Sequence, residues 1–189
     1  MSTLAATPSS IVALGWTQPE RAVAFEPWLT TVAAQHDLLP DTVRAASADA
    51  SFRRYFRVDR RAGGACIVMD APPAQENCEP FVRIAGLLQA AGLLVPRILA
   101  WEPALGFMLL DDLGADTMMA ALAPAAHATP LPLFKRATDA LLQMQQQARP
   151  EGLPAYDEAL LMRELSLFPD WYVQQHKGLT LDTAQQNML

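Results

Sequence analysis

The stretch Ser51-Phe-Arg-Arg-Tyr-Phe-Arg-Val-Asp59 decides the fold of this 189-residue chain. Its apolar and polar side chains alternate with a period of two, which is typical of a β-strand with one buried face. The alternation places on the expected buried face Phe52, Phe56 and Val58, and on the opposite face Arg53, Tyr55 and Arg57. A glycine-containing turn at residues 61–64 and the apolar run Ala65-Cys-Ile-Val-Met69 follow. We therefore predict an antiparallel hairpin.

A helix and a second hairpin are expected after this first hairpin. Apolar residues recur at helical spacing between 81 and 88, and Gly92 follows as a C-terminal stop. Strand patterns return at 97–101 and 107–110, on either side of a turn. The sequence therefore predicts a sheet made of two hairpins with a helix inserted between them.

The regions on both sides of the hairpins have helical patterns. Thr17 and Glu20 have the spacing of a capping box at the start of a first helix. Helices are expected over 131–148 and over 157–175, the second of which should be interrupted at Pro169. Because helices and strands are segregated along the chain, we predict an α+β fold with an antiparallel sheet rather than a doubly wound α/β sheet.

The composition excludes several classes of protein. A formal net charge of −6 argues against a surface that coats nucleic acid. Two cysteines, Cys66 and Cys78, are too few for a disulfide framework or a zinc site, and a reduced cytoplasmic setting is expected. No apolar stretch is long enough to predict a membrane span, and no basic residue before Arg21 suggests a signal peptide. The preference for arginine over lysine indicates a GC-rich bacterial genome.

Several motifs together resemble the aminoglycoside-phosphotransferase superfamily of kinases. The closest resemblance is to its sugar-kinase branch, which phosphorylates the anomeric hydroxyl of N-acetylmuramate and N-acetylglucosamine in peptidoglycan recycling. The resemblance covers roughly residues 45–189. The motifs that carry it are Ser47-Ala-Asp-Ala-Ser-Phe-Arg-Arg-Tyr-Phe-Arg57, Ile67-Val-Met-Asp-Ala-Pro-Pro73, Gly106-Phe-Met-Leu-Leu-Asp-Asp-Leu-Gly114 and Phe168-Pro-Asp-Trp-Tyr172.

The resemblance implies a protein-kinase-like fold with two lobes. We expect residues 1–112 to form an N-terminal helix and a nucleotide-binding N-lobe. Residues 113–189 would then be the hinge and the first helices of an incomplete, all-helical C-lobe. ATP and Mg²⁺ are the implied cofactors, and a small-molecule sugar is the implied partner, with no nucleic acid and no membrane.

The turn at Asp49-Ala50-Ser51-Phe52 lies where a kinase folds a hairpin tip over the phosphates of the nucleotide. Its backbone N–H groups, the Ser51 hydroxyl and either Arg53 or Arg54 are therefore expected to bind phosphate. The alternative interpretation is a solvated turn with arginines on the outer face of a strand.

The segment Asp111-Asp112-Leu113 would be the hinge, where backbone groups contact the adenine edge. Its two carboxylates could also cap the next helix while Gly114 makes a turn, and both interpretations can hold together. Met69 stands where kinases usually place a lysine, which leaves an arginine of the hairpin as the substitute cation. Without that lysine, Glu76 and Glu79 are expected to be solvent-exposed acids at the start of a helix.

The catalytic loop H-x-D-x-x-x-x-N of the superfamily is absent from the sequence. Neither His36, His127 nor His176 begins this pattern, so we expect no catalytic residue and no metal ligand in this chain. Glu164 and Trp171 fall in the part of the C-lobe that shapes the acceptor site, and a contact with the sugar is one interpretation of them.

We therefore interpret the chain as the N-terminal fragment of an ATP-dependent sugar kinase, inactive by itself. Its C-terminal helices would expose apolar faces at about 1.5–3 kcal/mol for each side chain, which predicts instability or self-association. The alternatives are a related kinase with an aminoglycoside, choline or homoserine acceptor, or a non-catalytic module that binds nucleotide or another protein. The acceptor, the oligomeric state and the reason for the end at Leu189 stay open at this point.

Overall fold

The computed structural model describes residues 11, 14–16, 18–48, 51–122, 130–186 and 188. The chain divides into two compact units, Met1–Arg149 and Pro150–Leu189, and each is considered by itself. The lobe boundary predicted between residues 112 and 113 lies within the first of these units, and it stays a prediction.

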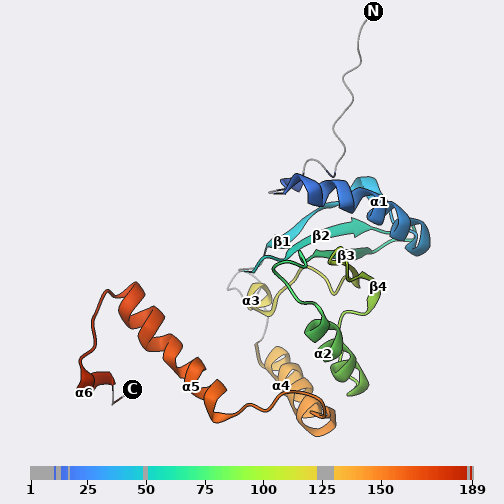
Figure 1. Ribbon diagram of the computed structural model, residues 1–189. Coiled ribbons are helices and arrows are strands. Elements are labelled where there is room, and N and C mark those ends of the chain that lie inside the picture. Colours follow the sequence, from blue (N-terminus) through green and yellow to red (C-terminus); the bar gives the residue numbers. More distant parts are fainter. Residues whose placement is uncertain are drawn as a thin grey trace, which may run out of the picture. The chain divides into compact units, whose positions relative to one another are not determined.

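An antiparallel five-stranded sheet forms the centre of the first unit (Figure 1). The strands lie in the order β1-β2-β3-β5-β4, so that two hairpins are joined through β3 and β5. The predicted α+β class and both hairpins are confirmed. The bounds are β1 Arg44–Ala48, β2 Arg54–Asp59, β3 Ala65–Asp70, β4 Ile98–Glu102 and β5 Phe107–Asp111.

Helix α1 (Pro19–His36) covers one face of the sheet. Phe25 and Leu29 of α1 are fully buried against Phe56 and Phe107 of the strands. The ring centroids of Phe25 and Phe107 lie 5.4 Å apart in an edge-to-face arrangement, which adds to the energy of simple burial. The cap position of α1 is Gln18, whose side chain makes no capping hydrogen bond, and Thr17 lies outside the described residues.

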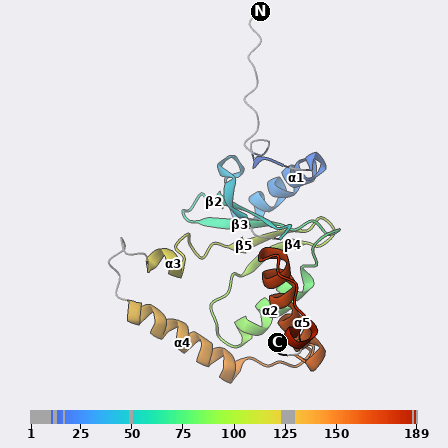
Figure 2. The ribbon, with the colours of Figure 1, turned by 90° about the vertical axis from the view of Figure 1, so that its left-hand side faces the viewer.

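Helix α2 (Glu79–Ala90) lies on the opposite face, as Figure 2 also shows. Phe81 of this helix packs against a second core cluster that contains Met69 and Met108. The period of two therefore predicts the two faces of β2 correctly from residue 54 onward. Phe52 is an exception, because it precedes the strand and its side chain is 59% exposed rather than buried.

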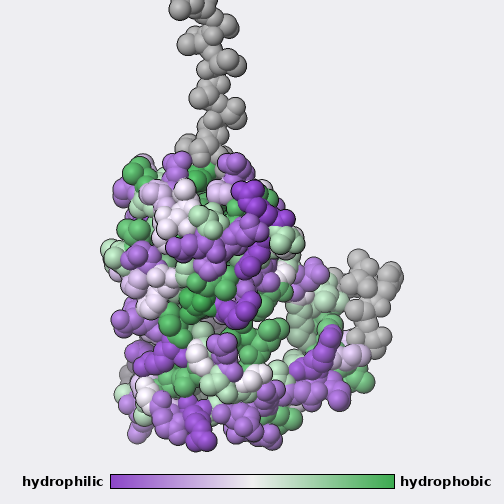
Figure 3. Space-filling model, turned by 90° about the vertical axis from the view of Figure 1, so that its right-hand side faces the viewer, coloured by the Kyte–Doolittle hydropathy of each residue, from purple (hydrophilic) through white to green (hydrophobic). Residues whose placement is uncertain are grey.

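The helices after the sheet bury little of their apolar surface within their own units. They are α3 Met118–Ala121, α4 Pro130–Gln147, α5 Glu158–Leu167, the π-helix η4 Phe168–His176 and α6 Thr183–Gln186. A short 3-10 helix before the sheet, η2 Pro40–Thr42, precedes β1. Phe134, Leu165 and Trp171 are examples of exposed apolar side chains on them. Apolar side chains also gather across the middle of the face shown in Figure 3. No helix within the described ranges has the length and apolar character needed to span a membrane.

The expected interruption at Pro169 is a change of helix type. α5 gives way to the π-helix at Phe168, and the chain keeps turning through Pro169. Because proline has no N–H, it cannot donate the hydrogen bond that an α-helix requires at this position. The chain here adopts the wider turn of a π-helix, a rare form that is frequently found at functional sites.

Gly106 is required by the close approach of the two hairpins. Its φ is +70°, and a Cβ there would lie 1.9 Å from the carbonyl oxygen of Ala71. Ala71 N–H donates to the carbonyl oxygen of Gly106 at 2.9 Å, so this contact extends the pairing of β3 with β5. Any side chain at position 106 would separate the two strands.

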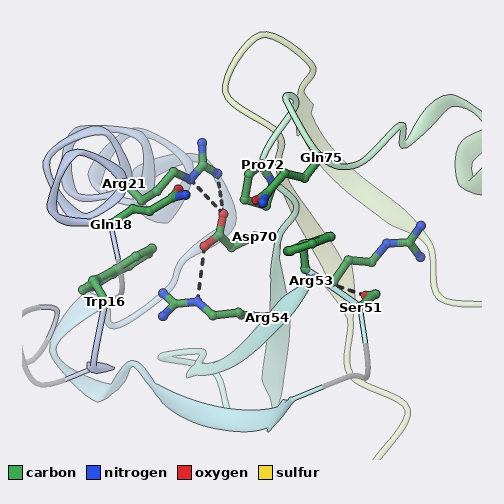
Figure 4. A pocket seen from close by; sticks show the side chains of 10 residues that line it. Trp16, Gln18, Arg21, Ser51, Arg53, Arg54, Asp70, Pro72 and Gln75 are labelled. Atoms are coloured by element: carbon green, nitrogen blue, oxygen red, sulfur yellow. Dashed lines mark hydrogen bonds and ion pairs between the residues drawn. The ribbon is translucent and has the colours of Figure 1, made fainter. Parts of the chain in front are cut away.

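One buried carboxylate connects α1 with the sheet. Asp70, at the end of β3, is 2% exposed and forms ion pairs with Arg21 of α1 and Arg54 of β2 (Figure 4). Arg21 also donates to the carbonyl oxygen of Leu105 at 2.7 Å, and it lies over the ring of Phe107. A buried charge is tolerated only when it is paired in this way.

Replacing Asp70 with alanine should lower the free energy of unfolding by about 3–5 kcal/mol, because two partly buried arginines would lose their partner. The measurement is urea-induced unfolding followed by tryptophan fluorescence. Asp139→Ala is the matched control, since its ion pair with Lys135 is exposed and should contribute less than about 1 kcal/mol. Equal effects of the two substitutions would contradict the structural importance of Asp70.

Candidate functional site

A cavity of about 400 Å³ lies where the sheet ends and the chain passes to the helices. Its floor is the α2 side of the sheet, with the side chains of Tyr55, Ile67 and Leu110. Its rim is the chain segment from Asp111, the last residue of β5, to Ala115, and residues 112–115 lie beyond the sheet. An apolar floor beside backbone that has left the sheet suits a planar heterocycle with polar edges.

Arginines of neighbouring strands hold the two carboxylates of the rim. Arg57 donates to Asp112 through Nε at 2.6 Å and Nη2 at 3.1 Å. Arg97 donates to Asp111 in the same bidentate manner, at 2.5 and 3.2 Å. Hydrogen bonds from these arginines hold the pKa of each carboxyl below its usual range. The two carboxylates therefore point to different partners, as expected from their adjacent positions.

The alternative in which these aspartates cap the next helix is wrong. The Thr117 hydroxyl caps α3 by accepting from the Ala120 N–H at 3.1 Å. Asp112 instead accepts from the N–H of Gly114 at 2.9 Å, which makes a turn within the rim. Both aspartates thus stabilise the course of the backbone between the sheet and α3.

The two adjacent arginines of the hairpin lie on opposite faces of the sheet. Arg54 faces α1, where it pairs with Asp70 and lies over the Trp16 ring. Arg53 shares the other face with Tyr55, and its guanidinium points away from Asp70 in Figure 4. Of the two arginines expected to bind phosphate, only Arg53 is on the face that carries the cavity.

Glu76 is not the exposed helix-start acid that the sequence indicated. Its side chain is 11% exposed, and its carboxylate accepts from the Phe52 N–H at 3.1 Å and from Arg53 Nε at 3.0 Å. The missing lysine therefore does not leave Glu76 without a cation. Glu79 does lie exposed in the first turn of α2, as expected.

The remaining predicted site residues have varied positions. Asp49 and Ala50 lie outside the described residues, and Ser51 is exposed, with its hydroxyl accepting from the Arg53 N–H at 3.1 Å. Leu113 is exposed on the rim of the cavity. Met69 is fully buried in the second core cluster, so its side chain adds no surface to the cavity.

The two cysteines are buried and unreactive. Burial raises the pKa of the Cys66 and Cys78 thiols, so neither is a candidate nucleophile at neutral pH. Cys66 accepts a hydrogen bond from Arg60 at 3.1 Å. Their contribution is packing, in agreement with the absence of a disulfide framework.

A shallow apolar groove continues the cavity along α2. The groove and the cavity share Phe81 and Pro96, and Arg53 lies in the lining of the groove. A ligand with its ring in the cavity could therefore extend over Phe81 toward the guanidinium of Arg53. This is the arrangement that a molecule with a planar head and an anionic tail requires.

The second unit contains the residues proposed to contact an acceptor. Glu164 of α5 and Trp171 of η4 are both exposed, and Trp171 is 67% exposed. Phe168, Tyr172 and His176 stack in a column beside them, with ring centroids 5.4 and 5.5 Å apart. Within the part of the chain that is described, no three His, Cys, Asp or Glu residues gather as metal ligands.

Comparison with known proteins identifies the class of protein. The sequence model of the phosphotransferase enzyme family matches residues 42–189, and the chain therefore belongs to this family. Among curated proteins, it is 52% identical over 145 residues to the N-acetylmuramate/N-acetylglucosamine kinase of Pseudomonas aeruginosa, a match that covers 76% of this chain and 41% of that protein.

Two further relatives carry the same printed name. The kinase of Pseudomonas putida is 50% identical over 145 residues, which cover 77% of this chain and 42% of the relative. That of Neisseria meningitidis serogroup B is 33% identical over 173 residues, which cover 89% and 49%. The matches therefore extend over less than half the length of these relatives.

The residues that the sequence analysis missed are charged partners far apart in the chain. Arg21, Arg57, Asp70 and Glu76 received no role or the wrong one. The period of two already separates Arg53 from Arg54, and applying it to β3 would have placed Asp70 beside Val68 on the α1 face. The partner of each charge, in contrast, depends on the strand order.

The contribution of Asp112 to stability should be complete above about pH 4 and should decline in more acid solution. Because Arg57 lowers the folded-state pKa of Asp112, its contribution is present above the unfolded pKa of about 3.9 and is lost as the pH falls through the folded value. The free energy of unfolding of wild type and Asp112→Asn should differ at pH 7 and converge in acid. Asp116→Asn, at an exposed neighbour, should show no such difference. A difference for Asp112 that persists at pH 2 would contradict the ionic origin.

Proposed function

We propose that this chain supplies the N-terminal part of an ATP-dependent sugar kinase that phosphorylates the anomeric hydroxyl of N-acetylmuramate and N-acetylglucosamine. The observation that carries the proposal is the identity of about half of the aligned residues to two kinases named for these sugars. The family model matches residues 42–189, which include the hairpin tip and the rim of the cavity.

In this proposal the adenine of ATP occupies the cavity and its phosphates extend toward the hairpin tip. The apolar floor and the backbone of the rim suit the ring. Arg53, with the backbone N–H group of Ser51, offers donors for the phosphates, whereas the N–H of Phe52 is engaged by Glu76. Asp49, Ala50, Phe52, Asp111, Asp112 and Leu113 complete the proposed nucleotide site. The burial of Met69 and the ion pair of Arg54 with Asp70 favour structural roles for those two residues.

No metal ligand is assigned among the described residues. Phosphoryl transfer requires Mg²⁺ to neutralise the phosphate oxygens, and its ligands would be acidic groups near those oxygens. No group of three candidate ligands is present within the described ranges. We therefore derive no step through Mg²⁺ from this chain, whose proposed part is to bind and orient the nucleotide.

The second unit is proposed to contribute to the sugar site. Glu164 and Trp171 offer a carboxylate for sugar hydroxyls and an open aromatic ring for the apolar face of a pyranose. The exposed apolar residues of α4, α5 and η4 are then the surfaces on which the remainder of a helical lobe would pack. In its absence we expect these faces to drive self-association of the chain.

Two observations favour alternatives. The cavity is independent of the acceptor, so a related kinase with an aminoglycoside, choline or homoserine acceptor would share it. Met69 in place of a lysine, together with the absence of an H-x-D-x-x-x-x-N loop, suits a module that binds nucleotide without turnover. We prefer the sugar kinase because the relatives carry that name, and we place it in the cytoplasm, in peptidoglycan recycling.

The decisive test is phosphate transfer from ATP by the protein as the cell makes it. N-acetylmuramate and N-acetylglucosamine should be phosphorylated, whereas kanamycin, choline and homoserine should not. Phosphorylation of one of the latter three instead would replace the acceptor, and ATP binding without transfer would favour the binding module. A purified chain of verified 20.6 kDa mass should be inactive, and turnover by it would contradict the proposed partial role.

Arg53 and Arg54 should respond differently to alanine substitution. Arg53→Ala should raise the KM for ATP by about tenfold, because it removes a cation on the cavity face. Arg54→Ala should instead lower the free energy of unfolding by about 1–3 kcal/mol, because Asp70 loses a partner. Steady-state kinetics of both variants in the protein as the cell makes it, together with urea unfolding, separate the two effects, and the opposite pattern would reverse the assignment of faces.

A further inference from the structure

Glu76 makes contacts that no sequence pattern indicated. It lies in the loop between β3 and α2, and its two carboxylate oxygens accept from different groups of the hairpin tip. Oε1 accepts from the backbone N–H of Phe52 at 3.1 Å, and Oε2 accepts from Arg53 Nε at 3.0 Å. One side chain from a distant loop thus fixes both the backbone and the arginine of the tip.

This ion pair is shielded from solvent. The side chains of Glu76 and Arg53 are 11% and 26% exposed, so their attraction is screened less than that of a surface pair. Burial alone would lower the pKa of Arg53, but the Tyr55 side chain and the Glu76 carboxylate together raise it. The arginine is therefore charged, and it is held between the strand and the loop.

The contact leaves part of the guanidinium for another acceptor. Glu76 engages Nε, and the Tyr55 side chain also interacts with the guanidinium, which carries two Nη groups in a fixed plane. Arg53 lines the groove that continues from the cavity. Arg57, the next arginine on this face, is bound in bidentate fashion by Asp112. Arg53 is consequently the better placed of the two to receive an anionic tail.

We propose that Glu76 is a positioning residue, which holds Arg53 and the Phe52 backbone so that the Nη groups of Arg53 meet the phosphates of a nucleotide in the cavity. The proposal rests on the proposed function, and it assigns to the hairpin tip and this loop the role that a strand lysine would have at position 69. Preorganisation of a long, flexible side chain improves binding because its rotamer freedom is not lost when the ligand arrives.

The test compares two ligands on the full chain. The affinity for a non-hydrolysable ATP analogue depends on contacts with both the ring and the phosphates, whereas the affinity for adenosine has no contribution from phosphates. Dissociation constants are measured for wild type and Glu76→Gln, with Glu79→Gln as the matched control on an exposed glutamate three residues away. We expect Glu76→Gln to weaken the ATP analogue by about tenfold and adenosine not at all, and Glu79→Gln to change neither.

The other outcomes overturn the proposal in distinguishable ways. Equal weakening of both ligands by Glu76→Gln would mean that Glu76 only supports the fold. Tighter binding of the analogue would mean that the carboxylate competes with phosphate for the same donors. If wild type binds neither ligand, the proposed function fails together with this inference. If wild type binds both ligands equally well, binding of the ring in the cavity is supported, and the proposed contact of Arg53 with the phosphates is contradicted.

A double-mutant cycle tests whether Glu76 acts through Arg53. If Glu76→Gln is poorly folded, Arg53→Lys alone, which keeps the Glu76 carboxylate, should weaken the ATP analogue and leave adenosine unchanged. In an Arg53→Lys background the Nε contact is absent, since lysine has no equivalent donor. The further substitution of Glu76 should then change the affinity for the ATP analogue much less than it does in wild type. Independent, additive effects of the two substitutions would contradict a shared role.

Discussion

The buried carboxylate of Asp70 is the interaction on which the arrangement of the first unit depends. It ends β3 and holds Arg21 of α1 and Arg54 of β2, so that one charge joins the helix to both hairpin strands. The two guanidinium groups lie over the rings of Phe107 and Trp16, which belong to the same aromatic cluster as Phe25. Charge and aromatic packing therefore specify the same docking position for α1.

The cavity lies on the face of the sheet opposite α1, beside α2. Because successive side chains of a strand point to opposite faces, Arg54 lies on the α1 face and pairs with Asp70, whereas Arg53 lies on the face that carries the cavity. The rim of the cavity is fixed by a second set of arginines, through Asp111 and Asp112. Each of these ion pairs joins segments that are distant in the sequence, and the site is built on a rigid frame.

Local patterns in the sequence were sufficient for β2, β3, β4 and β5, for α2 and for the α+β class, whereas they gave no separate prediction of the edge strand β1. They failed at Phe52, because the alternation of apolar and polar residues extends to positions before Arg54, where β2 begins. They also failed at Glu76, because its position before α2 suggested a helix-start acid and its partners lie across the sheet. The hinge role of residues 111–113 stays a prediction, and the partners of Asp111 and Asp112 depend on the pairing of β2 and β4 with β3 and β5. Contacts of this kind follow from topology, which local periodicity does not specify.

The contacts of Arg21 have a consequence for the way the sheet assembles. Pairing of β3 with β5 closes a long loop that contains α2 and β4, and loop closure is the slow, entropically unfavourable step in forming non-local strand pairs. Arg21 binds Asp70 at one end of this loop and the carbonyl of Leu105 at the other. Arg21 of α1 can make both contacts only after the two hairpins have paired. The hairpins therefore gain much of their stability together rather than one at a time.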